Sequence, residues 1–107
     1  MTYRIVDAAS FEGRRKLIAQ ELGASAIRLN RFDNQPAQEG KEHDESGSGQ
    51  EEIYIPVEGS GFIRIGEEEI PLESGRFVLV TPNETRQVVA GPDGLAYVVV
   101  GAVVDGR

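Results

Sequence analysis

The sequence contains no cysteine and only one histidine among its 107 residues. Without cysteine, a disulfide framework and any thiolate nucleophile are excluded. A histidine-rich zinc site is excluded as well, because only one imidazole is present. Metal binding would have to rely mainly on carboxylates, and His43 is the single imidazole that could transfer a proton.

Long apolar runs and an excess of basic residues are also missing. No apolar stretch is long enough to span a bilayer, and the first ten residues lack the basic-then-apolar pattern of a signal peptide. The chain has 11 Lys and Arg against 18 Asp and Glu, a formal net charge of -7. This charge argues against nucleic acid and anionic membranes as partners. We therefore expect a cytoplasmic protein that binds neither.

The length and composition fit one small domain. With 107 residues, of which 39% are hydrophobic, the chain can bury a modest core. No internal repeat, linker or low-complexity tail divides the sequence. We expect a single domain over residues 1–107, with a helix at about 10–22 and a barrel at about 26–104.

The helix is predicted from capping residues and an apolar stripe. Ser10 is a good N-cap, Glu12 would lie in the first turn, and Gly23 supplies the end. The apolar residues fall on a rough helical stripe at Phe11, Leu17, Ile18, Ala19 and Leu22. Arg14, Arg15 and Lys16 form the polar side. We interpret these three as a solvated helix face, with anion binding as the alternative.

Short apolar runs separated by turn residues fill the rest of the chain. Residues 26–32 alternate apolar and polar side chains with a period of two, which is typical of a half-buried strand. Residues 95–100 are almost entirely apolar, which predicts an inner strand covered on both faces. Further strands are predicted at residues 3–6, 53–57, 62–65, 69–72, 76–80 and 86–90, with turns at 58–61 and 91–94. This spacing indicates a β-sandwich or barrel.

The polar chemistry is concentrated between residues 42 and 61. His43 is followed by acidic residues and by a Gly/Ser turn at 46–49, after which Gln50 and Glu52 precede the apolar strand at 53–57. A histidine beside carboxylates can act as a general acid or base near neutral pH. Tyr54 on that strand is interpreted as a core aromatic with a hydrogen-bonded hydroxyl group.

This segment resembles the first motif of the cupin superfamily: His, any residue, His, three or four residues, Glu, six residues, Gly. His43 matches the first histidine, and Glu52, followed by six residues and Gly59, matches the glutamate. Glu45 stands where the second histidine belongs. The Gly/Ser insertion makes the gap between Glu45 and Glu52 longer than the motif has.

Residues 75–86 follow the spacing of the second cupin motif: Gly, five residues, Pro, any residue, Gly, two residues, His. Thr81 takes the proline position, and Asn83 takes the glycine position, because asparagine tolerates a positive φ. Arg86 takes the histidine position. The resemblance covers about residues 27–102. It implies an all-β, cupin-type double-stranded β-helix, or jelly-roll barrel, with one short N-terminal helix.

The resemblance also implies that His43, Glu45, Glu52 and Arg86 meet inside one end of the barrel. Metal-binding cupins hold iron, manganese, nickel or zinc with three histidines and one glutamate. Here His43, Glu45 and Glu52 would offer one imidazole and two carboxylates, a set that favours manganese or iron. Arg86 cannot ligate a metal, because its guanidinium stays protonated. A bidentate ion pair of Arg86 with Glu52 or Glu45 would replace the charge of the metal.

We expect a small-molecule-binding cupin that holds a polar or acidic organic ligand near Arg86 and His43. The predicted ligand-binding residues are His43, Glu45, Gln50, Glu52, Tyr54 and Arg86. The alternative is a metal-dependent cupin enzyme of the dioxygenase or isomerase type, with manganese, iron, nickel or zinc on His43, Glu45 and Glu52. A barrel filled by side chains, with a structural or partner-binding role, is the third interpretation. No catalytic residue is assigned.

A homodimer is the remaining expectation. Small cupins commonly pair through the edges of their sheets, and the strands near both termini look apolar. A flat edge strand left unpaired is an aggregation hazard, so we expect a second copy to cover it.

Overall fold

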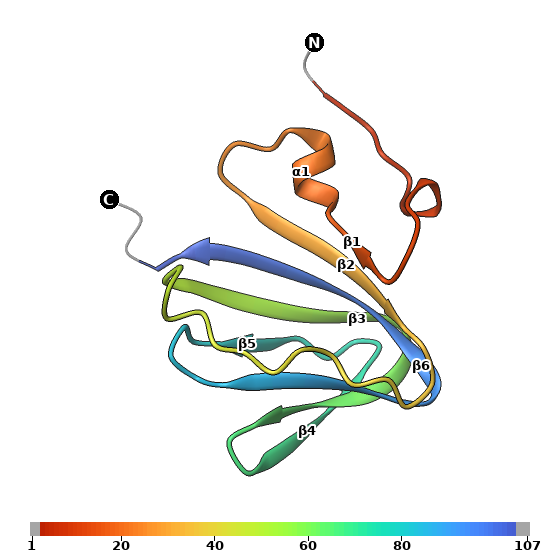
Figure 1. Ribbon diagram of the computed structural model, residues 1–107, viewed down its shortest axis with the longest axis vertical. Coiled ribbons are helices and arrows are strands. Elements are labelled where there is room, and N and C mark those ends of the chain that lie inside the picture. Colours follow the sequence, from red (N-terminus) through yellow and green to blue (C-terminus); the bar gives the residue numbers. More distant parts are fainter. Residues whose placement is uncertain (1–2, 105–107) are drawn as a thin grey trace.

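The computed structural model describes residues 3–104, and most of them lie in strands. The elements in chain order are η1 (Ala8–Ser10), β1 (Arg15–Lys16), α1 (Ile18–Leu22), β2 (Arg28–Asn34), β3 (Gln50–Ile65), β4 (Glu68–Glu73), β5 (Val78–Val80) and β6 (Arg86–Val103). Figure 1 shows the helical turns gathered at one end, beyond β2, and the long strands forming the rest. The predicted all-β fold with one short N-terminal helix is confirmed.

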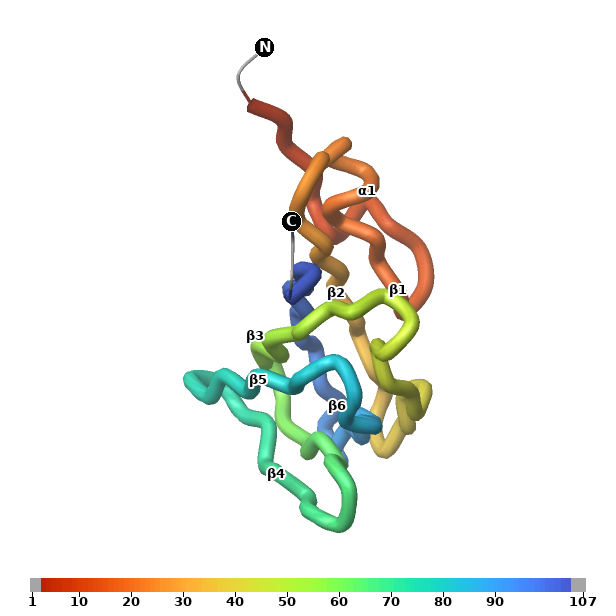
Figure 2. Tube along the Cα trace, turned by 90° about the vertical axis from the view of Figure 1, so that its left-hand side faces the viewer, coloured from red at the N-terminus to blue at the C-terminus, as the bar shows by residue number. Residues whose placement is uncertain are grey.

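The strands form one six-stranded antiparallel sheet in the order β1-β2-β6-β3-β4, with β5 paired to β3. β3 and β6 pair along two stretches: residues 50–56 with 97–103, and residues 61–65 with 86–90. Both strands bend between these stretches, so that the sheet folds over itself into two layers (Figures 1 and 2). This is the double-stranded arrangement of a jelly-roll barrel.

The predicted turns at residues 58–61 and 91–94 are wrong, because β3 and β6 run through them without a break. Register shifts between Pro56 and Glu58 and between Gly59 and Gly61 mark bulges at the bend. Gly59 has a φ of 76°, and a Cβ atom there would collide with the carbonyl oxygen of Gly94. These glycines therefore permit a sharp bend with close backbone approach, instead of ending a strand.

The helix predicted at about residues 10–22 is also wrong in extent, since α1 covers only Ile18–Leu22. The chain before it is extended, and β1 pairs with Arg31 and Phe32 of β2. Ser10 does not cap the helix; its hydroxyl group donates to the carbonyl oxygen of Asp7 at 2.7 Å. The predicted end is confirmed, because Gly23 adopts a φ of 74° at the C-cap.

The core lies between the two layers, where alternate side chains of each strand point inward. Its buried members are Tyr54, Ile63, Leu72, Val80, Val88, Ala90, Leu95, Tyr97 and Val99. The inner position predicted for residues 95–100 is confirmed, since this part of β6 runs between β2 and β3. Its outward Val98 and Val100 stay partly exposed, so only one face is fully covered. Within residues 3–104, no helix has the length and apolar character to cross a membrane.

Candidate functional site

The inner face of the sheet opens into a cavity of about 580 Å³. Its lining includes all six residues predicted to bind a ligand: His43, Glu45, Gln50, Glu52, Tyr54 and Arg86. Phe32, Tyr97 and Val99 add apolar surface to the same cavity. The structure therefore brings the two motifs together at one place, and the role of these residues in binding a ligand stays a prediction.

Strand register and one isolated bridge position these side chains. On β3 the period of two turns Glu52 and Tyr54 inward, opposite Gly101 and Val99 of β6. His43 lies outside the named strands, but its backbone N–H donates to the Arg86 carbonyl at 3.0 Å, and its carbonyl oxygen accepts from the Arg86 N–H at 2.8 Å. The loop that carries His43 is thereby held against the start of β6.

Arg86 is the most extensively bonded side chain of the site and is only 1% exposed. Its Nη2 lies 3.1 Å from Glu52 Oε1, and its Nε donates to the Tyr54 hydroxyl at 3.2 Å. Its Nη1 donates to the carbonyl oxygens of Thr81 and Glu84 at 3.1 and 2.6 Å. The predicted ion pair with Glu52 is thus present. It is not bidentate, because the other two nitrogens bind Tyr54 and the carbonyl groups.

Burial opposes the charge on Arg86, but its hydrogen bonds to Tyr54 and Glu52 and the negative charge of Glu52 outweigh burial and raise the pKa of Arg86 above its ordinary value. Tyr54 donates its hydroxyl proton to Glu52 Oε1 at 2.9 Å. Burial, reinforced by the charge of Glu52, raises the pKa of Tyr54 well above its ordinary value. The three side chains therefore form one hydrogen-bonded unit of a cation, a carboxylate and a neutral phenol.

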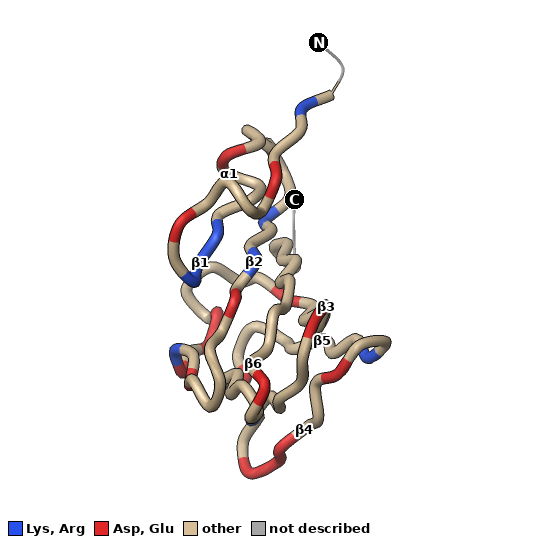
Figure 3. The backbone as a smooth tube through the Cα atoms, turned by 90° about the vertical axis from the view of Figure 1, so that its right-hand side faces the viewer, with Lys and Arg blue, Asp and Glu red and all other residues tan. Residues whose placement is uncertain are grey.

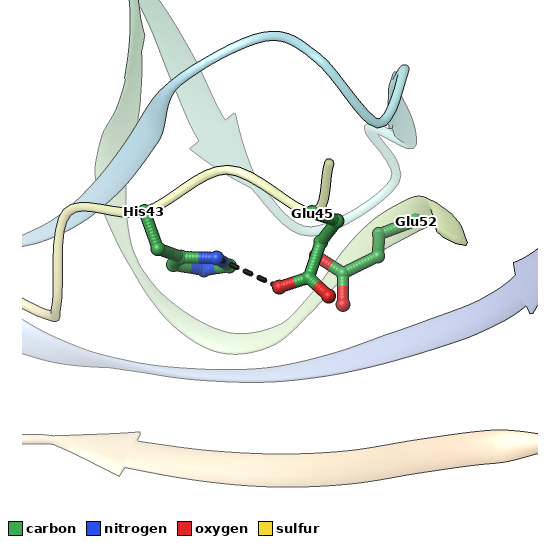
Figure 4. Close-up of side chains that lie close together, drawn as sticks. All are labelled: His43, Glu45 and Glu52. Atoms are coloured by element: carbon green, nitrogen blue, oxygen red, sulfur yellow. Dashed lines mark ion pairs between the residues drawn. The ribbon is translucent and has the colours of Figure 1, made fainter. Parts of the chain in front are cut away.

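The second polar group of the cavity consists of His43, Glu45 and Glu52, which each offer a ligand atom within 4.8 Å of the others. Figure 4 shows the two carboxylates side by side and the imidazole pointing at Glu45, whose Oε2 lies 2.9 Å from His43 Nδ1. The Gly/Ser insertion does not keep Glu45 away. Its turn is closed by a bond from the Gly49 N–H to the Glu45 carbonyl, and the Ser48 hydroxyl donates to Glu45 Oε1 at 2.7 Å.

This donor set is compatible in kind and spacing with a hard divalent cation such as manganese or iron. Two features weaken the fit. Arg86 already neutralises Glu52, and its charge lies 3.1 Å from the carboxylate that would ligate. Glu45 likewise already accepts bonds at both oxygens, from His43 and Ser48. A cation could be held by His43, Glu45 and Glu52, but it would compete with partners that are in place.

The part of the cavity lined by β1 and β2 is basic, and sequence reasoning missed it. Arg14, Arg15, Arg28 and Lys41 line the cavity together with Asn30. Arg14 and Arg15 were expected on a solvated helix face, but this segment is extended and runs along β2. Arg28, Asn30 and Phe32 alternate along β2 and share its inward face, and the sequence shows this alternation. The sequence has no signal for the pairing of β1 with β2, which brings Arg15 to the same cavity.

No family profile and no curated protein matches the sequence. Solved structures do. A cupin protein from Bacteroides fragilis has a TM-score of 0.82 at 23% identity, covering 100% of this chain and 89% of the other. A Cupin 2 conserved barrel domain protein from Salinispora arenicola has a TM-score of 0.77 at 19% identity, covering 97% of this chain and 90% of the other. A sugar phosphate isomerase from a cupin superfamily, from Silicibacter pomeroyi, has a TM-score of 0.75 at 16% identity, covering 92% of this chain and 75% of the other.

These identities are low, so the likeness concerns the fold. It extends over nearly the whole chain and agrees with the spacing of both motifs. The chain has the cupin fold.

Proposed function

We propose that the protein binds a small polar or acidic organic molecule inside the barrel, beside His43 and Arg86. The observation that carries the proposal is the cavity itself. Its volume of about 580 Å³ is in the range of small-molecule sites, and convergent polar groups face an apolar floor within it. A barrel filled by its own side chains would leave no such space, so this observation counts against the purely structural interpretation.

In this proposal Arg86 acts mainly as a support. Arginine carries five N–H donors, and four hydrogen bonds already leave Arg86 toward Tyr54, Glu52 and two carbonyl groups. It fixes the carboxylate of Glu52 and the phenol of Tyr54 in place. The ligand would then meet Glu52, Gln50 and the His43–Glu45 pair, whose imidazole can exchange a proton with a bound hydroxyl or carbonyl group.

A metal-dependent enzyme is the second candidate, favoured by the spacing of the His43, Glu45 and Glu52 ligand atoms, all within 4.8 Å. A bound divalent metal would supply a Lewis acid that polarises an oxygen of the substrate. The residues of this chain would hold the ion through one imidazole and two carboxylates. Arg86 and Tyr54 would orient Glu52 from behind.

Ligand screening tests the first candidate. Thermal shift measurements with a panel of sugars, polyols and small organic acids should find at least one stabilising compound. His43→Ala should weaken its binding, whereas Glu51→Gln should not, because Glu51 is exposed on the outward face of β3, next to Glu52. Binding that survives His43→Ala and Glu52→Gln would place the ligand elsewhere and contradict the proposal.

Metal analysis separates the two candidates. Protein purified without chelator would be analysed by mass spectrometry and titrated calorimetrically with manganese, iron, nickel and zinc. Stoichiometric, tight binding that His43→Ala abolishes would favour the metalloenzyme. Absence of tight binding to any of the four would favour the metal-free ligand site.

We further infer that the protein forms a homodimer, but not for the reason that the sequence suggested. Residues 3–6 form no strand, and β6 lies inside the sheet. The edge strand β4 carries exposed Glu68, Glu69 and Glu73, which would repel their copies. Apolar side chains instead cover the outward face of the sheet, where Ile53 and Leu79 pair in register at 38% and 54% exposure. Sedimentation that shows only monomer at micromolar concentration would contradict this inference.

A further inference from the structure

We propose that the wall of the cavity formed by β1 and β2 is an oxyanion subsite, where Arg15 and Arg28 bind a phosphate or carboxylate group and Arg14 and Lys41, which line the same cavity, add positive charge. The inference rests on the proposed function, since it names the chemical class of the ligand in the same cavity. The ligand it describes is anionic at one end and carries hydroxyl or other polar groups at the end near Glu52.

The charge distribution supports the proposal. Five of the 11 basic residues but only three of the 18 acidic residues line the cavity. The lining therefore carries +2, although the whole chain carries -7. Figure 3 shows Lys and Arg on β1 and on the adjoining part of β2, and Asp and Glu along β4 at the far end. A protein that repels anions overall needs such a local reversal to bind one.

The two faces of β1 and β2 treat their basic residues differently. On the outward face, Lys16 and Arg31 are both ion-paired with Asp33, at 2.8 and 3.1 Å. On the cavity face, Arg15 and Arg28 have no carboxylate within 4.0 Å among residues 3–104. Within residues 3–104, a counter-ion is thus present on one face of these strands and absent on the other. A cation left free beside a cavity can pair with a ligand.

Arg14 adds a guanidinium group whose position is already fixed. Its Nη1 donates to Asn34 Oδ1 at 2.9 Å, and its guanidinium carbon lies 5.3 Å from the centre of the Phe32 ring. A planar guanidinium held in this way loses little conformational freedom when it binds an oxyanion. Arg86 does not compete for this role, because four of its hydrogen bonds are internal and its side chain is 0% exposed.

Gly101 connects the two ends of the cavity. Across the sheet, Arg28 of β2 and Glu52 of β3 both lie opposite Gly101 of β6. A Cβ atom at residue 101 would lie 2.6 Å from Gln50 Oε1 and 3.4 Å from Glu52 Cγ. The glycine therefore lets the side chains of Gln50 and Glu52 pack close over its backbone. Because Arg28 and Glu52 line the same cavity, one ligand can contact both, with its anionic group at the basic residues and its hydroxyl groups near Glu52.

The test uses NMR titration of the whole chain with two separate probes, inorganic phosphate and succinate, at constant ionic strength set by chloride. Wild-type protein should show saturable amide shifts in β1 and β2 with at least one probe. The double variant Arg15→Gln with Arg28→Gln should weaken that binding by about tenfold, the effect expected from losing a charge-assisted hydrogen bond. Arg14 is left unchanged, since its bond to Asn34 makes it part of the structure.

Arg31→Gln is the matched control, because Arg31 lies on the same strand and the variant removes one charge from the opposite face. Its affinity should stay within about twofold of wild type, a shift small beside the tenfold effect of a lost charged contact.

Saturation by phosphate alone assigns the subsite to phosphate esters, and saturation by succinate alone assigns it to carboxylates. Failure of both probes to saturate, or an equal loss in Arg31→Gln, overturns the subsite. If compounds from the thermal shift screen bind less tightly to His43→Ala but equally well to the double variant, the subsite is contradicted and the proposed function is not.

Discussion

The two walls of the cavity use arginine in opposite ways. On the wall formed by β3 and β6, Arg86 is 1% exposed and donates four internal hydrogen bonds. On the wall formed by β1 and β2, Arg28 is exposed and has no carboxylate partner among residues 3–104. A buried charge is tolerated only when it is fully paired, whereas an exposed charge needs no partner. The comparison supports a structural role for Arg86 and the proposed role of Arg28 in ligand recognition.

The largest expected effect comes from removing the buried cation. Arg86→Ala leaves Glu52, whose side chain is only 14% exposed, without its partner and should lower the free energy of unfolding by about 3–5 kcal/mol. Arg28→Ala should change it by no more than about 0.5 kcal/mol, because the side chain is on the surface. Chemical denaturation monitored by circular dichroism measures both. Similar losses in the two variants would show that the walls do not differ.

The second effect concerns alkaline pH and Tyr97. Burial raises the pKa of Tyr97 to about 12, while its ordinary value is 10.0. A group whose pKa is raised by folding stabilises the protein fully below the ordinary pKa, and this contribution is lost as the pH rises to the folded value. We expect the free energy of unfolding to fall between pH 10 and 12, by roughly 3 kcal/mol for two pKa units.

Tyr97→Phe should flatten that decline, because phenylalanine has no proton to lose. Urea titrations at several pH values between 9 and 12 would measure the slope for both proteins. Tyr54, whose pKa is also raised mainly by burial, keeps part of the decline in the variant. An unchanged slope in Tyr97→Phe would mean that its phenol ionises as easily in the folded as in the unfolded chain.

A smaller effect is expected from Tyr54→Phe. The variant removes the hydroxyl group that donates to Glu52 at 2.9 Å and accepts from Arg86 at 3.2 Å. Leaving these buried groups unsatisfied should cost about 1–3 kcal/mol. Tyr3→Phe is the control, because Tyr3 is 68% exposed. Equal melting temperatures for the two variants would show that the phenol contributes nothing to the Arg86 unit.

The last effect is a gain in metal affinity. Arg86→His removes the cation from Glu52 and places an imidazole at the position where the second cupin motif has its histidine. The variant should bind manganese, iron or nickel more tightly than wild type, as measured by calorimetric titration. Adding His43→Ala to it should abolish the gain. No binding by the variant would mean that His43 and Glu52 do not converge on residue 86.

The sequence predicted the fold because its signals are local. Period-two alternation predicted a strand near β2. The resemblance to the two cupin motifs implied that His43, Glu52 and Arg86 meet, and all three line one cavity. It failed where tertiary contacts override local preference. Gly59 and Gly94 lie in segments whose glycines predicted turns, but in the structure they allow the continuous strands β3 and β6 to bend together.

The basic wall was missed for the same physical reason. The apolar stripe before Gly23 favours a helix over residues 10–22, and only the pairing of Arg15 with Phe32 reveals an extended segment. Strand pairing between distant residues has no local pattern. The turn that lets Glu45 reach His43 is equally a property of the folded loop, since the insertion alone gives no direction to the side chain.

A crystal structure of protein purified without chelator and soaked in phosphate is the most direct test of the difference between the two walls. The account predicts a phosphate ion against Arg15 and Arg28, Arg86 still paired with Glu52, and no anomalous metal peak beside His43. A metal peak within bonding distance of His43, Glu45 and Glu52, or phosphate bound at Arg86 in place of Glu52, would contradict it.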